Sequence, residues 1–509
     1  MPNLYTVPAH APIARFSARH ILGTLESTAL ANAVLLLPNR RASVVMRQAF
    51  ARELEGKASL LPRMIPLADI ENELVSLMGD SAFEALAAIP QAMSESEQRY
   101  ILAQQVAAYE RKRMGAVTIH YALTLADALM QLQEQCTRAG VEITQEKLRQ
   151  LFYADYAEHW REALLFLGIL TDTWPEIEKA YGLTTAANRE TRMMEALARH
   201  WQASPPDYPV IAIGSTASQP ATAILLKTVA DMLLGQVILP GLDVAMPEED
   251  WQRIEAGHPL FHLKQFLEKW PVAPSEVSTL AQAKPSIWLE ALAPTAAIVD
   301  WPTRQLPHHE SLRIIPCAHA EEEARVICLL LREGLENPSA HNALITPDEG
   351  LLARIATHMQ RYGIMVDRLN AGTLANTETG SAWLALVAAI REPERQLPLR
   401  ELLHHPLLAL DEALLQGLEK GWYGLNRSRA GQLPRHDASL ATHPNYAPLV
   451  VLVQQLAQLN RASMRVSEWL TTLEALITPW QKQPGKAMDA VNEQLQAMRH
   501  ADALGLMGI

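Results

Sequence analysis

Apolar and polar positions between residues 34 and 70 predict a strand, a tight turn and an amphipathic helix. Val34–Leu37 is a short apolar run of the length that a buried strand takes. Pro38 and Asn39 interrupt the run, and Asn39 is a typical helix N-cap residue. The helix behind it should bury one set of side chains at helical spacing and expose another. The buried set is Ala42, Val45, Met46, Ala49, Phe50 and Leu54, and the exposed set is Ser43, Arg47 and Gln48.

The first turn of this helix carries Arg40 and Arg41, although a helix N-terminus favours acidic side chains. Two arginines there oppose the helix dipole by about a few tenths of a kcal/mol. A positive helix start beside arginines is also a ready site for an anion. Two solvated arginines on a surface turn account for the same residues equally well, so both interpretations stand at this point.

A second group of apolar runs predicts a strand–helix–strand unit later in the chain. Val210–Ile213 is followed by a helix that begins near Pro220, and Val237–Leu239 comes next. We expect the two strands to be parallel, with a right-handed crossover, and to join Val34–Leu37 in one sheet. The hydroxyls expected to cap the intervening helix are those of Ser215, Thr216 and Ser218.

The remaining pattern predicts an α/β fold with a large all-helical insertion. A first α/β domain spans residues 1–93 and 203–270, and the helical insertion spans residues 94–202 within it. A linker with a short helix at Ile287–Leu292 spans residues 271–310. A second α/β domain spans residues 311–395, and a helical region spans residues 396–509. The second domain should contain strands at Leu312–Cys317, Asn342–Thr346 and Ile364–Val366, with helices between them. Gly363 occupies a left-handed C-cap position before the last of these strands.

Composition is that of a folded cytoplasmic protein with a local basic region. The chain has 509 residues and a net charge of −12, which excludes a uniformly basic nucleic-acid coat. Residues 1–63 nevertheless hold eight Lys/Arg against three Asp/Glu, a surplus of five positive charges. Three cysteines make neither a disulfide framework nor a zinc site. The N-terminus is not a signal peptide, and no apolar run approaches the ~18 residues of a membrane span.

The sequence lacks the motifs of nucleotide and metal chemistry. The turn after Val34–Leu37 reads PNRRAS, which has neither the glycines nor the lysine of a phosphate loop. The strand at Val210–Ile213 ends in Gly214-Ser215 rather than in a magnesium-binding acidic pair. The pairs His308-His309 and His404-His405 lack helical zinc spacing. We therefore expect no catalytic residue, no metal and no cofactor in this chain, and no ATP hydrolysis.

Five segments together resemble the N-terminal half of the AddB subunit of the AddAB helicase–nuclease, most closely the alphaproteobacterial type. They are VLLLPNRRASVVMRQAF, LLPRMIPLADI, VIAIGSTASQPAT, VILPGLD and LLHHPLLAL, and they follow the family order from Val34 to Leu410. The resemblance implies a degenerate superfamily-1, UvrD/Rep-like P-loop helicase fold that lacks the phosphate loop. It also implies a cytoplasmic role in double-strand break repair by homologous recombination, with single-stranded or forked DNA and an AddA-like motor subunit as partners.

The family continues into a C-terminal nuclease domain with an iron–sulfur staple, and neither motif is found up to Ile509. We therefore expect a truncated or fragmentary member without nuclease activity. Arg40, Arg41 and Arg47 are the expected phosphate contacts, with Asn39 and Arg63 nearby. The alternatives are a helicase or ATPase with a divergent phosphate site, and a partner-binding remnant that does not contact DNA.

Overall fold

The computed structural model forms two compact units, Met1–His308 with Ala497–Ile509, and His309–Gln496. The structure describes residues 3–151, 157–282, 291–303, 312–337, 342–367, 377–392, 396–408, 410–423, 443–459 and 465–478, together with a few isolated positions. Within these residues no helix has the length and apolarity needed to cross a bilayer.

Parallel strands form the central sheet of the first unit, in the order β3-β2-β6-β7-β1-β8 among the described residues. The strands are β1 Leu4–Val7, β2 Val34–Leu37, β3 Arg63–Pro66, β6 Val210–Ile213, β7 Gly235–Pro240 and β8 Ser278–Thr279. In the register, Val34 of β2 lies opposite Arg63 of β3 and Val210 of β6. The predictions of β2, β6 and β7 as parallel strands of one sheet are confirmed.

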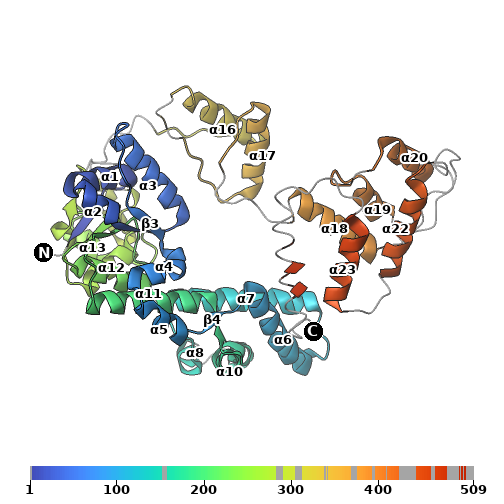
Figure 1. The fold of residues 1–509 in the computed structure, drawn as a ribbon, viewed down its shortest axis with the longest axis horizontal. Coiled ribbons are helices and arrows are strands. Elements are labelled where there is room, and N and C mark those ends of the chain that lie inside the picture. The colour runs from blue at the N-terminus through green and yellow to red at the C-terminus, as the bar shows by residue number, and fades with distance from the viewer. Residues whose placement is uncertain are drawn as a thin grey trace. The chain divides into compact units, whose positions relative to one another are not determined.

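Helices cover both faces of this sheet (Figure 1). The helices α1 (Ile13–Thr24) and α3 (Arg40–Glu53) cover one face, and α4 (Ile70–Met78), α11 (Ala186–Ala203) and α12 (Pro220–Asp231) cover the other. Successive residues of β2 alternate between the two cores: Leu35 belongs to the same buried cluster as Phe50 of α3, whereas Leu36 belongs to the same buried cluster as Leu225 of α12. All four residues of β2 are buried, which is typical of a parallel strand enclosed on both faces.

The hydrophobic pattern does not predict β1 or β3, although both are integral to the sheet. β1 lies between β7 and β8, and its Thr6 is fully buried because the hydroxyl donates to the Leu239 carbonyl at 3.1 Å. β3 ends at Pro66, and no strand is predicted for its residues, Arg63–Pro66. Because each strand has only four residues and includes polar or proline positions, it becomes recognisable only through its pairing partner.

The helix α3 begins behind Asn39 as predicted, but two of its side chains point the other way. Ser43 is buried and Val45 is 45% exposed, so their assignments to the exposed and buried faces are wrong. Ser43, Met46 and Phe50 follow one line at i, i+3 and i+7, and this line faces α1 and the sheet. Val45 lies off that line and therefore faces solvent.

The predicted helical block consists of α6 (Glu95–Met114), α7 (Ile119–Arg138), α8 (Gln145–Leu151), α9 (Ala157–Gly168) and α10 (Trp174–Tyr181), followed by α11. It has its own apolar core, in which Leu102 and Leu129 are buried. Two short parallel strands, β4 (Gln91–Ala92) and β5 (Leu183–Thr184), pair where the block begins and ends. The last helix, α11, contributes instead to the core beneath the central sheet. An α/β fold with a helical insertion is therefore shown.

The second unit contains helices where the sequence predicts them but not the predicted strands. It begins with α16 (Ala320–Gly334) and α17 (Glu349–Arg361) and continues with α18 (Glu378–Arg391), α19 (Gln396–Leu403), α20 (Glu412–Tyr423), α22 (Tyr446–Leu459) and α23 (Val466–Ile477). The strands predicted at Leu312–Cys317, Asn342–Thr346 and Ile364–Val366 are wrong, since the described residues there have no strand structure. Apolar side chains from the last two segments instead pack against α16 and α17. The helix predicted at Ile287–Leu292 lies largely outside the described residues.

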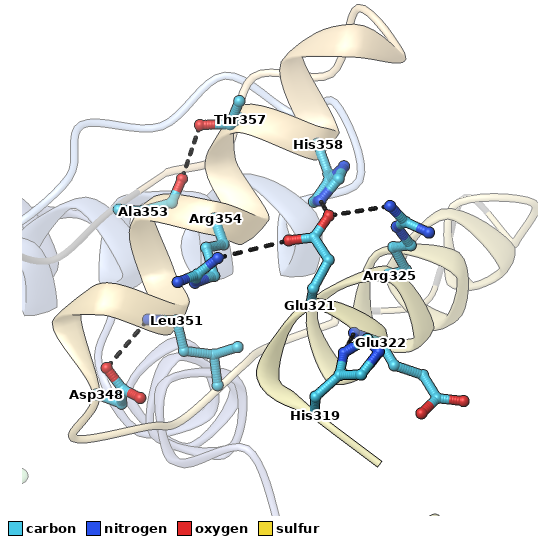
Figure 2. Close-up of polar contacts among 10 residues, drawn as sticks. All are labelled: His319, Glu321, Glu322, Arg325, Asp348, Leu351, Ala353, Arg354, Thr357 and His358. Carbon is cyan, nitrogen blue, oxygen red and sulfur yellow. Dashed lines mark hydrogen bonds and ion pairs between the residues drawn. The ribbon is translucent and has the colours of Figure 1, made fainter. Parts of the chain in front are cut away.

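The carboxylate of Glu321 links α16 to α17 (Figure 2). Glu321 of α16 lies 3.0 Å from His358 Nε2 and 3.6 Å from Arg354 Nη1, both on α17. Arg325, on the same helix as Glu321, approaches it at 3.2 Å. Desolvation by itself raises the pKa of Glu321, but the His358 hydrogen bond and the nearby cations outweigh it and lower that pKa. Because the buried apolar cluster between these helices is small, this contact is part of what holds them together.

Candidate nucleic-acid interface

The carboxyl ends of β2 and β6 form a topological switch point in the sheet. From β2 the chain passes through α3 to β3 on one side, whereas from β6 it passes through α12 to β7 on the other. The two crossover helices cover opposite faces. In open α/β sheets, ligands bind outside the carboxyl ends of the strands at such a point. This position therefore contains the start of α3 and the loop that follows β6.

Asn39 fixes the start of α3 at this edge of the sheet. Its side-chain oxygen accepts a hydrogen bond from the Ala42 N–H at 2.9 Å, as predicted for an N-cap. No acidic residue occupies the first turn of α3. The start of this helix therefore keeps the positive end of its dipole without a carboxylate of its own helix to offset it.

Arg40 is ion-paired, which the sequence analysis does not foresee. It donates from Nε and Nη2 to the two carboxylate oxygens of Asp69, each at 2.8 Å. The Arg40 side chain remains 81% exposed, and the Asp69 side chain is 21% exposed. The hydrogen bonds from Arg40 lower the pKa of Asp69, and the same bonds raise the pKa of Arg40. Both groups are therefore charged at neutral pH, and the pair has no net charge.

Arg41 and Arg47 lie on the exposed surface of α3 with Arg40. Arg47 is seven residues beyond Arg40, so the two lie on the same side of the helix. Within the described part of the chain, Arg47 has no ion-pair partner. The neighbouring Val44 is 48% exposed, which places an apolar side chain within this basic surface.

The structure does not bring Arg63 to the other predicted residues. Arg63 begins β3 and lies opposite Val34, at the amino ends of the strands. Asn39 and Arg40 follow the carboxyl end of β2, at the other edge of the sheet. Arg63 also contacts Glu73 and Ser76 of α4. Its side chain is therefore engaged away from the start of α3.

The loop after β1 is a second position at which a phosphate loop could occur. This loop, Pro8–Pro12, leads into α1 and reads PAHAP. It contains no glycine and no lysine, so the phosphate-binding pattern is missing here as well as after β2. Pro12 precedes α1 without a capping side-chain hydrogen bond.

The loop after β6 approaches the start of α3 through Gly214. A Cβ atom built on Gly214 would lie 3.9 Å from Pro38 and 3.8 Å from Ile13, and its φ of +77° suits glycine. The serine next to it, Ser215, accepts from the Ala217 N–H at 3.3 Å. The N-cap of α12 is Gln219, which makes no capping hydrogen bond, so the predicted capping roles of Ser215, Thr216 and Ser218 are wrong.

Part of the predicted basic surplus is neutralised inside the first unit. Glu53 at the end of α3 accepts hydrogen bonds from Arg15 at 2.7 Å and from Arg19 at 3.0 Å. These contacts connect α1 to α3, and the Glu53 side chain is only 13% exposed. The arginines of α1 therefore link α1 to α3, although their side chains stay more than half exposed.

Asp69 is the residue of this site that the sequence analysis misses. It belongs to a 3₁₀ turn, Leu67–Asp69, directly after β3. Only the pairing of β3 with β2 places this turn beside the start of α3.

In the described residues no three His, Cys, Asp or Glu side chains are grouped to hold a metal ion. The pair His308-His309 lies outside the described residues, while His404 contacts Glu419.

No family model matches the chain, and no curated protein matches it.

Proposed function

We propose that this chain is a helicase-like DNA-binding scaffold of a double-strand break repair helicase–nuclease. In this role it holds single-stranded DNA beside an AddA-like motor subunit and guides the strand during recombinational repair. The chain itself contributes binding and no catalysis. The P-loop helicase ancestry of its first unit is part of the same proposal and rests on the sequence resemblance.

The observation that carries the proposal is the start of α3 at the switch point of the sheet. Asn39 caps a helix whose first turn holds Arg40 and Arg41 and no acidic residue. Backbone N–H groups and arginine side chains at a helix start are suited to phosphate oxygens. Arg47 extends this positive surface along the helix.

The same geometry favours a nucleic-acid backbone over a nucleotide. The loops after β1 and β2 both lack the glycines and the lysine that hold nucleotide phosphates. The loop after β6 begins with Gly214 and Ser215 and offers no carboxylate for Mg²⁺. A phosphodiester chain requires only cations and N–H donors along its path.

The test is a pair of charge-removing substitutions, Arg40→Gln with Arg41→Gln. The protein is co-purified with the candidate motor subunit, and binding to forked DNA is measured at several salt concentrations. Loss of phosphate contacts should weaken binding and flatten the dependence of log K on log salt, by about 0.7 for each full positive charge that is removed from the interface. Arg63→Gln, at the amino ends of the strands, is the control and should change neither the affinity nor the salt dependence. Unchanged binding by the double variant would show that the site is wrongly assigned.

Measurement of ATP binding and turnover on the purified chain tests the divergent-ATPase alternative. Saturable hydrolysis that is lost on substituting a residue at the end of β1 or β6 would overturn the non-catalytic role. Crosslinking of DNA to α3 in the assembled complex separates the DNA-binding role from a purely partner-binding one.

A further inference from the structure

The contact between Arg40 and Asp69 has the geometry of a complete carboxylate–guanidinium pair. Two donors on one edge of Arg40 meet the two oxygens of Asp69, each at 2.8 Å. Such bidentate pairs are the arrangement in which arginine also holds phosphate. Asp69 directly precedes α4, where a carboxylate commonly caps a helix, yet it makes no capping hydrogen bond there. The carboxylate is directed toward Arg40 instead.

This pair changes what Arg40 offers to an anion. A neutral pair contributes little to the release of counter-ions on DNA binding, whereas a lone guanidinium contributes a full charge. A phosphate that approaches Arg40 also meets the negative charge of Asp69, and like charges on one cation repel each other. The carboxylate therefore opposes the phosphate and does not assist it.

We propose that Asp69 is an autoinhibitory carboxylate that occupies Arg40 until a DNA phosphate displaces it. The proposal rests on the DNA-binding role of Arg40 proposed above and assigns a regulator to that site. An exposed ion pair shifts an equilibrium by only about two- to fivefold. This strength is sufficient to disfavour weak, isolated phosphate contacts, and a strand that also engages Arg41 and Arg47 can overcome it.

The variant Asp69→Asn tests this assignment because it removes the charge and keeps the size and a hydrogen-bond acceptor. The matched control is Glu73→Gln, which removes one negative charge from the same unit at Arg63. Binding of a fluorescein-labelled oligothymidine to the full chain is followed by anisotropy between low and moderate salt. The variant Asp69→Asn should bind about two- to fivefold more tightly, with a salt slope steeper by about 0.7. The control should match the wild type.

The combination of Arg40→Gln with Asp69→Asn should bind less tightly than Asp69→Asn alone, because the guanidinium that Asp69→Asn frees is then missing. Affinity that is unchanged or reduced in Asp69→Asn overturns the proposal, while weakened binding by the Arg40/Arg41 variant would leave the DNA role intact. An equal gain in Asp69→Asn and Glu73→Gln also overturns it, as a general charge effect. Absence of oligothymidine binding in every variant overturns both. The Asp69→Ser variant repeats the measurement if Asp69→Asn has a lowered melting temperature.

Discussion

Substitution of Asn39 separates the folding of α3 from the binding of an anion at its start. The Asn39 side chain caps the helix at 2.9 Å and carries no charge. Asn39→Ser keeps a neutral cap, Asn39→Asp keeps the cap and adds a negative charge, and Asn39→Ala removes the cap. The three variants therefore change the cap and the charge independently, at one position beside Arg40.

The expected stabilities follow from the cap and the dipole. Loss of the cap in Asn39→Ala should destabilise α3 by about 1 kcal/mol. Asn39→Asp should equal the wild type or exceed it by about 0.3–1 kcal/mol, because a negative charge at a helix start is favourable. This gain is accentuated here by the absence of any acidic residue in the first turn. Amide hydrogen exchange of residues 40–53 measures these differences locally.

The expected affinity of Asn39→Asp for DNA changes in the opposite direction to its stability. A carboxylate at position 39 lies where a phosphate is proposed to bind, and repulsion of about 1 kcal/mol corresponds to roughly fivefold weaker binding at low salt. Asn39→Ser should bind single-stranded DNA as the wild type does. Anisotropy with a labelled oligonucleotide provides the measurement. If Asn39→Asp binds as tightly as Asn39→Ser while α3 is equally protected, no phosphate lies at the start of α3.

Two further predictions concern the packing of the first unit. The Arg189 side chain is 5% exposed and donates to the Ile89 carbonyl at 2.8 Å and to Glu71 at 2.9 Å. Arg189→Met leaves these acceptors without their donor, so it should lower the free energy of unfolding, measured in urea, by about 2–3 kcal/mol. A change below about 0.5 kcal/mol would contradict this. Hydrogen bonds from Arg15 and Arg19 lower the pKa of Glu53, so its contribution to stability is present at neutral pH and is lost as the pH falls through that lowered value. In thermal unfolding, Glu53→Gln should therefore be less stable than the wild type at pH 7, and the difference in stability should shrink below about pH 4. A difference that persists at low pH would refute the ion-pair explanation.

The proposed site could be predicted only in part. The cap and the exposed arginines of α3 follow from local signals: an asparagine after an apolar run, and arginines at the first positions of a helix. The ion pair of Arg40 does not follow from local signals, because its partner Asp69 lies 29 positions away in the sequence and is brought near by strand pairing. The absence of Arg63 from this site has the same cause, since the register of β3 places Arg63 opposite Val34, at the amino ends of the strands.

The sequence by itself determined the elements whose signals are local. The strands β2 and β6 are continuous apolar runs, and α3 and α12 begin where Asn39 and Pro220 predict. Tertiary structure decided everything that depends on a distant partner: β1 as a strand between β7 and β8, Ser43 as a buried residue, and Arg40 as one half of an ion pair. The same dependence explains why no strand forms at three segments of the second unit that the sequence predicts as strands, Leu312–Cys317, Asn342–Thr346 and Ile364–Val366. An extended apolar segment becomes a strand only when another backbone supplies its hydrogen bonds.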